Sequence, residues 1–176
     1  MISSRTFFSG ILALALSSQA CSWLNAPPRA GEILTSADAS ELFGVPMRVT
    51  YDSRDKYHKN VSTVTLSGDS AGGRQFELSL TLCFSDSESL RSAEQTWRYG
   101  KDYPVEPPGF VMISGIGESA WTLPRGTGRD YLVRLSHCYF VMSVGGTSYA
   151  DGPTINDKLI ELTRSLAARL AERNAS

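Results

Sequence analysis

The segment Gly68–Gly73 contains the Gly-x-Ser-x-Gly pattern that positions a nucleophilic serine, with Ser70 at its centre. In that motif a sharp turn from a strand into a helix exposes the serine hydroxyl beside a helix N-terminus. The residues that follow, Arg74–Phe84, alternate between polar and apolar side chains and so predict a strand instead of a helix. We therefore expect a hairpin loop here. A small envelope serine hydrolase that uses Ser70 with His137 stays as the alternative function.

A second motif joins Gly115, Gly117 and Ala120, which have the spacing of a dinucleotide-binding loop. That loop needs a helix directly after it, so that the phosphates meet the helix N-terminus. Pro124 follows closely and would break such a helix, so we interpret the segment as a structural turn. The chain has two histidines and no Cys-x-x-Cys pair, and we predict neither a metal site nor a cofactor.

Length and charge narrow the class of protein. The chain has 176 residues, of which 41% are hydrophobic and 20% are charged, as expected for one globular domain. Its 17 basic residues against 18 acidic ones give a net charge of −1. A protein that neutralises nucleic acid phosphates needs a basic excess, so we predict no nucleic acid partner.

The first twenty residues have the features of an export signal. Arg5 supplies a positive charge, the uncharged run Phe7–Leu16 follows, and small or polar residues lead to Ala20. As a helix, ten residues span roughly 15 Å, about half of a hydrocarbon core, so the run is too short for a stable membrane span. We predict a signal peptide over residues 1–20.

Cys21 follows the signal directly. Ser17–Cys21 resembles a bacterial lipobox, which implies that the cysteine is acylated before the signal is removed. The chain has three cysteines, and acylation of Cys21 leaves an even number in an oxidising compartment. We expect Cys21 to anchor the domain in membrane lipid at the periplasmic face of the outer membrane, with residues 21–32 as a tether. Plain secretion and a cytosolic location are the alternatives.

Residues 33–176 form the predicted domain. Periodicity predicts an α+β fold, a mostly antiparallel sheet flanked by helices in the order α-βββ-α-βββ-α. Capping residues at Thr35, Ser85 and Thr154 mark the three helix starts. The expected strands are Met47–Ser53, Val61–Ser67, Gln75–Phe84, Glu118–Leu123, Asp130–Leu135 and Cys138–Val144, and Phe110–Ser114 is a short strand or the approach to one.

Two segments of the domain resemble a known group of proteins. Ile33–Pro46 and Gly115–Ala120 are similar to the opening and to the glycine-rich hallmark of many small bacterial lipoproteins of largely uncharacterised function. The resemblance implies a PsbP-like α/β sandwich and an envelope location. It implies no activity.

An aromatic cluster surrounds a proline-rich loop. Trp97, Tyr99, Tyr103 and Phe110 lie close together in sequence, with three prolines among them. Exposed aromatic side chains of this kind could bind a peptide, a glycan or a partner protein. Alternatively, the loop covers the sheet with its own aromatic side chains. Both interpretations stay open at this point.

The remaining cysteines, Cys83 and Cys138, both lie on predicted strands. No other partner is left once Cys21 is acylated, so we predict a disulfide that closes a loop of about 55 residues. Taken together, the sequence predicts a non-enzymatic, membrane-tethered periplasmic binding or accessory module. Its expected partners are membrane lipid, through Cys21, and an envelope protein or polymer.

Overall fold

The computed structural model describes residues 27–54, 60–70, 72–73, 75–99, 109–146 and 152–175. Seven strands form one antiparallel sheet in the order β1-β2-β3-β7-β6-β5-β4. The elements are α1 (Ala30–Ile33), α2 (Ser36–Phe43), β1 (Arg48–Arg54), β2 (Val61–Asp69), β3 (Gln75–Phe84), α3 (Ser87–Tyr99), β4 (Val111–Met112), β5 (Ser119–Arg125), β6 (Gly128–Arg134), β7 (Cys138–Gly145) and α4 (Pro153–Ala175).

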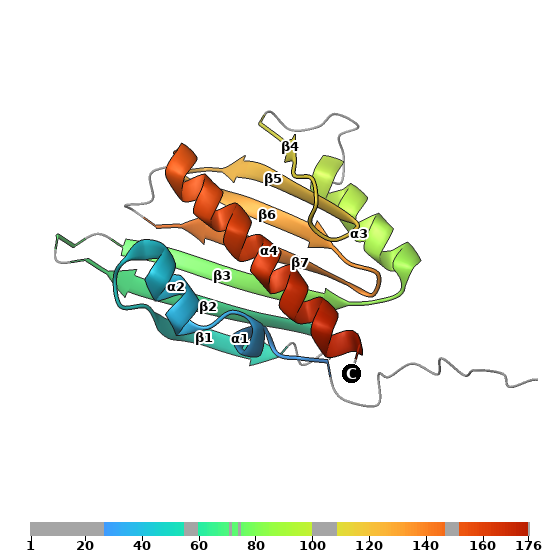
Figure 1. Ribbon diagram of the computed structural model, residues 1–176, viewed down its shortest axis with the longest axis horizontal. Helices are drawn as coiled ribbons and strands as arrows, with labels where there is room; N and C mark the ends of the chain where they lie inside the picture. Colours follow the sequence, from blue (N-terminus) through green and yellow to red (C-terminus); the bar gives the residue numbers. More distant parts are fainter. Residues whose placement is uncertain are drawn as a thin grey trace, which may run out of the picture.

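The helices lie on both faces of the sheet. Figure 1 shows α4 crossing one face diagonally, with α1 and α2 beside it. We call this the α4 face. The other face carries α3, which packs near β6 and β7, and we call it the α3 face. No helix within the described ranges is long and apolar enough to cross a membrane.

The predicted α+β class and the antiparallel sheet are confirmed, but the predicted order of elements is wrong in two places. A four-residue helix, α1, precedes the first expected helix, and β4 is an additional strand at the sheet edge. The order is therefore αα-βββ-α-ββββ-α. The helix α1 is too short to show a hydrophobic period in the sequence, so the prediction misses it, whereas β4 shows that Phe110–Ser114, expected as a short strand or the approach to one, contains a two-residue strand.

Two of the three predicted helix starts also change. The Thr35 capping box is confirmed, because Thr35 and Asp38 exchange backbone-to-side-chain hydrogen bonds of 2.9 and 3.3 Å. In α3 the cap is Asp86 instead of Ser85, since Asp86 Oδ1 accepts the backbone N–H groups of Glu88 and Ser89. The last helix begins at Pro153, one residue before Thr154. Proline suits this first position because its missing N–H would have no partner there.

The core lies on the α4 face. Alternate residues of β3 point into it, as the period of two predicts, and Leu80 pairs with Val64 on one side and Met142 on the other. All three side chains are fully buried. Their partners from the helices include Ile33, Leu159, Leu166 and Leu170.

The folded domain begins earlier than predicted. Ala30 and Ile33 are fully buried, and the Ala30 N–H donates to Ser62 Oγ at 3.0 Å. Arg173 of α4 also pairs with Glu32 at 2.8 Å. Residues 30–32, assigned to the tether from sequence, therefore belong to the domain. The predicted signal peptide and Cys21 lie outside the described residues.

Candidate functional site

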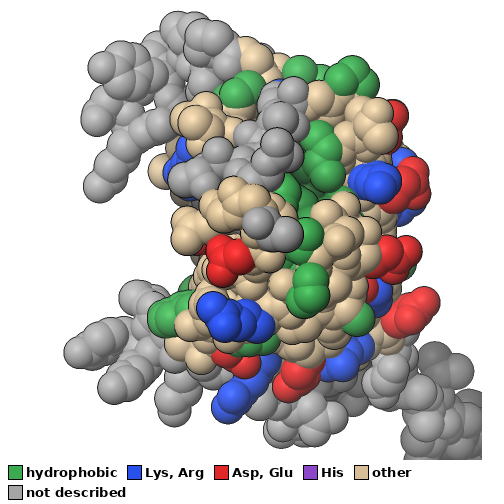
Figure 2. All heavy atoms as spheres, turned by 90° about the vertical axis from the view of Figure 1, so that its left-hand side faces the viewer, with side chains coloured by type: hydrophobic (Ala, Val, Ile, Leu, Met, Phe, Trp, Pro, Cys, Tyr) green, Lys and Arg blue, Asp and Glu red, His purple; other side chains and the backbone are tan. Residues whose placement is uncertain are grey.

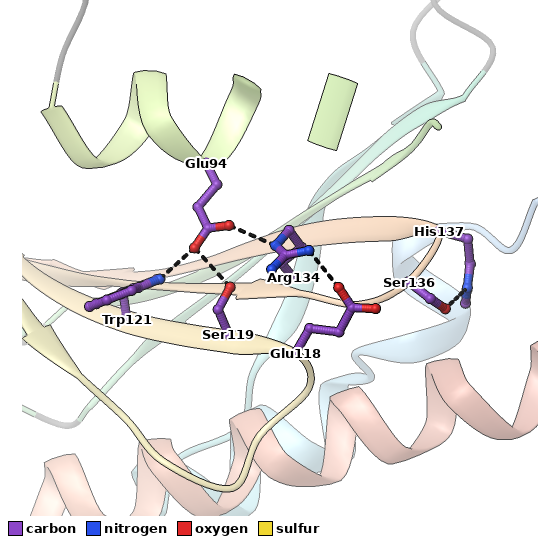
Figure 3. Close-up of polar contacts among 7 residues, drawn as sticks. All are labelled: Glu94, Glu118, Ser119, Trp121, Arg134, Ser136 and His137. Atoms are coloured by element: carbon purple, nitrogen blue, oxygen red, sulfur yellow. Dashed lines mark hydrogen bonds and ion pairs between the residues drawn. The ribbon is translucent and has the colours of Figure 1, made fainter. Parts of the chain in front are cut away.

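Glu94, near the middle of α3, is the centre of a polar network on the α3 face (Figure 3). Its Oε1 atom accepts hydrogen bonds from Ser119 Oγ and Trp121 Nε1, both at 2.8 Å. Its Oε2 atom accepts from Arg134 Nε at 2.7 Å, and Arg134 Nη1 pairs in turn with Glu118. The network therefore joins α3 to β5 and β6 through one carboxylate and one guanidinium.

The electrostatics of this network keep Glu94 ionised. Burial acts to raise the pKa of Glu94, but the hydrogen bonds from Ser119, Trp121 and Arg134 outweigh it and hold the pKa below its usual value. A general base needs a pKa near the working pH and a free lone pair for its proton. Glu94 has a lowered pKa and already accepts three hydrogen bonds, so it does not suit the role of a general base. Its contacts instead suit a structural role, in which it holds α3 against β5 and β6.

An aromatic pair lies next to this network. The ring of Phe110 packs on that of Trp121, with centroids 4.7 Å apart and planes tilted by 30°. Directly after Phe110 the chain forms β4, in which Val111 is 53% exposed and Met112 is 65% exposed. Met112 pairs with Trp121 in register. We call Phe110, Val111, Met112 and Trp121 the β4 patch.

The β4 patch lies at one edge of the sheet. Large exposed hydrophobic side chains in the described part of the chain are Val49, Tyr51, Val111 and Met112, and all four belong to the two edge strands, β1 and β4. Edge strands present unpaired backbone groups as well as side chains, so they are frequent places for contact with another chain. Contacts between aromatic rings distinguish the two edges. Among the ring contacts of the described residues, only the Phe110–Trp121 pair lies beside the exposed apolar residues of an edge strand.

The patch contains one of the four aromatic residues predicted to bind a partner. Phe110 is half-buried against Trp121. Trp97 and Tyr99 lie in α3, but the description does not extend to their side chains, and Tyr103 lies outside the described residues. Sequence reasoning missed Trp121. The sequence predicts that Trp121 lies in a strand. It cannot predict that Met112 lies beside Trp121, because that contact arises only when β4 pairs with β5.

The two members of the alternative hydrolase pair are far apart. Ser70 follows β2 directly, and its backbone carbonyl accepts a hydrogen bond from the Gly73 N–H in the turn that leads into β3. His137 lies beyond the other end of β3, where its carbonyl accepts the Ser85 N–H. The ten residues of β3 separate these ends by about 30 Å. The element after Gly73 is thus a strand, and the chain does not bring Ser70 to His137.

His137 instead contacts its neighbour in the chain. Ser136 Oγ lies 2.8 Å from His137 Nδ1 in the connection between β6 and β7 (Figure 3). Burial lowers the pKa of His137, and the charge of Glu118 acts in the other direction without outweighing it. Adjacent residues of a tight turn make such contacts through local geometry, so we assign this one to the turn.

The predicted Cys83–Cys138 disulfide is wrong, because both cysteines are free thiols. Cys83 pairs with Tyr139, and Cys138 pairs with Phe84. This offset of one residue places the two thiols on opposite faces of the sheet. Burial raises the pKa of both thiols, that of Cys138 to about 12.

The comparisons with known proteins add no family assignment to this geometry. The chain matches no family model, no curated protein and no solved structure.

Proposed function

We propose that this chain is a lipid-anchored, non-enzymatic domain of the bacterial cell envelope that binds a partner protein through the β4 patch. The observation that carries the proposal is the exposed side chain of Met112, which pairs in register with Trp121 beside the Phe110–Trp121 contact, while the exposed Val111 projects from the other face of the same edge strand. Exposed apolar side chains that adjoin one another, unlike scattered single ones, mark interaction sites.

The energetics favour side-chain docking over strand addition. β4 has only two residues, so a partner strand would gain few backbone hydrogen bonds from it. Burial of the exposed parts of Val111 and Met112 would contribute about 1–2 kcal/mol each. Trp121 adds a large ring whose orientation Glu94 fixes through Nε1. Such a preorganised aromatic residue loses little entropy when a partner binds.

The chemistry of the patch favours a protein over an envelope polymer. Val111 and Met112 offer apolar surface and no strong hydrogen-bonding group. A sugar polymer presents many hydroxyl groups, which lose hydrogen bonds to water on such a surface. The Trp121 N–H, which a sugar hydroxyl could otherwise accept, already donates to Glu94.

The location rests on the signal pattern and on Cys21. Two or more acyl chains hold a protein stably at a membrane, whereas one chain does so only marginally. We propose that acylated Cys21 holds the domain at the periplasmic face of the outer membrane. The nine residues from Cys21 to Arg29, which precede Ala30, the first buried residue of the described part, reach at most about 30 Å when extended. Ala30 would therefore lie within that distance of the membrane, and the β4 patch, four strands beyond β3 in the sheet, could lie about 20 Å further out.

Binding to isolated envelopes tests the proposal. Fluorescent protein carrying Cys21→Ser, which removes the anchor, is titrated onto envelopes of the bacterium that produces it. We expect saturable binding that is lost when the envelopes are treated with protease, and that weakens at least tenfold in Val111→Asp/Met112→Asp.

The matched control changes the opposite edge of the sheet. Val49→Asp/Tyr51→Asp introduces the same two charges at positions of similar exposure in β1, and it should bind like the parent. Equal losses in the two double variants, or binding that survives protease, would contradict the proposal.

A further inference from the structure

A groove with a volume of about 450 Å³ lies between α2 and α4, on the face opposite α3. Sites of a few hundred Å³ are large enough for a small ligand or for a few residues of a peptide. Leu42 of α2 and Leu162 of α4 line it. Leu42 is buried and Leu162 is half-buried against the core, so these two side chains give the groove an apolar floor.

At one end of the groove the charges neutralise each other. Arg169 donates to both carboxylate oxygens of Asp38, at 2.7 and 2.8 Å, and also to the Ile33 carbonyl at 2.8 Å. Despite the opposing effect of burial, the hydrogen bonds from Arg169 and Thr35 lower the pKa of Asp38 to about 2. Glu161, on the rim, is paired with Arg164. These groups therefore offer little net charge to a ligand.

Three charged side chains of the rim remain available. Glu41 projects from α2, and Asp157 and Lys158 project from α4. All three are exposed, and none of their side chains has a hydrogen bond or ion pair with another part of the chain that the structure describes. The carboxylates of Glu41 and Asp157 lie on opposite walls of the groove, and Lys158 carries the one positive charge among these three residues. Together they give the rim a net charge of −1. Figure 2, which faces the end of the molecule where α4 begins, shows acidic and basic side chains together along one side.

We propose that this groove binds a peptide segment of a protein in which a Lys or Arg stands beside apolar side chains. The apolar side chains would lie on Leu42 and Leu162, and the cation would lie between Glu41 and Asp157. The charge complementarity supports a cationic occupant, and the apolar floor requires that the cation be attached to an apolar body. A metal ion does not suit the same residues, because no His, Cys, Asp or Glu in the described ranges form a group of three or more that could hold one.

This site is independent of the β4 patch, since it lies on the α4 face and uses different elements. Loss of one site should therefore leave binding at the other unchanged.

The probe is the peptide acetyl-Gly-Leu-Lys-Leu-Gly-amide, titrated into isotope-labelled purified protein and followed by NMR. We expect shifts of backbone amide signals confined to α2 and the first half of α4. Replacement of the peptide Lys by Gln should weaken binding about three- to tenfold, because exposed charge pairs contribute modestly.

The double variant Glu41→Gln/Asp157→Asn should lose affinity for the Lys peptide by a similar factor. Its matched control is Asp69→Asn/Glu88→Gln, which removes the same charge from two exposed side chains outside the groove. The control should bind like the parent. The proposal would be overturned if both double variants bound the Lys peptide with equal affinity, if the Gln peptide bound as tightly as the Lys peptide, or if the shifts lay outside α2 and α4. Hexylamine, a cation on a simple alkyl chain, serves as a further control. The proposal would also be overturned if hexylamine bound as tightly as the peptide.

Discussion

Arg134 Nε lies 2.7 Å from Glu94 Oε2, and this ion pair joins α3 to the β5–β6 hairpin beside the β4 patch. Both side chains are mostly buried, 16% and 13% exposed, so water screens the pair weakly. The same carboxylate fixes the Trp121 ring against which Phe110 packs. The position of α3 and the shape of the patch thus depend on one side chain.

We therefore expect Glu94→Ala to lower the free energy of unfolding by about 2–4 kcal/mol, because it leaves Arg134 and the Trp121 N–H without their buried acceptor. Urea unfolding followed by far-UV circular dichroism measures this. Gln95→Ala, at an exposed neighbour on α3, should change stability by less than about 0.5 kcal/mol. Equal effects of the two substitutions would show that the network contributes nothing.

Acid should weaken the link between α2 and α4. The pKa of Asp38 is lowered to about 2 in the folded protein, below its usual value of 3.8. A depressed carboxyl pKa adds stability above the unfolded pKa, and that stability is lost as the pH falls from about 4 to 2. Asp38→Asn should therefore be less stable than the parent at pH 7, and its stability should fall less between pH 5 and pH 2. Parallel pH curves for parent and variant would refute this role of Asp38.

Gly117 and Gly126 provide a matched test of the glycine-rich turn. Both have φ of +58°, so alanine is strained at either position. At Gly117 an added Cβ would lie 2.5 Å from the Arg134 carbonyl oxygen, whereas at Gly126 it would meet nothing within 4 Å. We expect Gly126→Ala to cost about 1–2 kcal/mol and Gly117→Ala at least about 1 kcal/mol more. Thermal unfolding compares them, and equal costs would count against the close approach at Gly117.

The thiols should report that Cys83 and Cys138 are not bonded. In non-reducing conditions, both cysteines should take up an alkylating label once the protein is unfolded. In the native protein Cys138 should react slowly, because it is fully buried and its pKa is raised to about 12. Mass spectrometry of the digested protein identifies the label. A cross-linked peptide pair that contains both residues would contradict the register of β3 and β7.

Local patterns in the sequence were sufficient for much of the fold. The alternation along Gln75–Phe84 predicts β3, and the spacing of Thr35 and Asp38 predicts the start of α2. The same alternation argues against a helix after Gly73, and the structure has a strand there. These features depend on neighbouring residues only, so the sequence shows them directly.

Apart from the one-residue shifts at the starts of α3 and α4, the errors involve long-range pairing or very short elements. The disulfide prediction failed because the offset between Cys83 and Cys138 is set by how β3 pairs with β7. Phe110 could be singled out by its type, but Trp121 and Met112 become neighbours only when β4 pairs with β5. Ala30 is buried through α1, whose four residues carry no period.

Photo-cross-linking in intact cells tests the central claim most directly. The photoreactive residue p-benzoylphenylalanine is placed at Met112, 65% exposed in β4, or at Tyr51, 53% exposed in the opposite edge strand. The account predicts a discrete adduct with an envelope protein at position 112, absent at position 51, and depleted when Cys21→Ser removes the anchor. Adducts that are the same at both positions, or none at position 112, would contradict it.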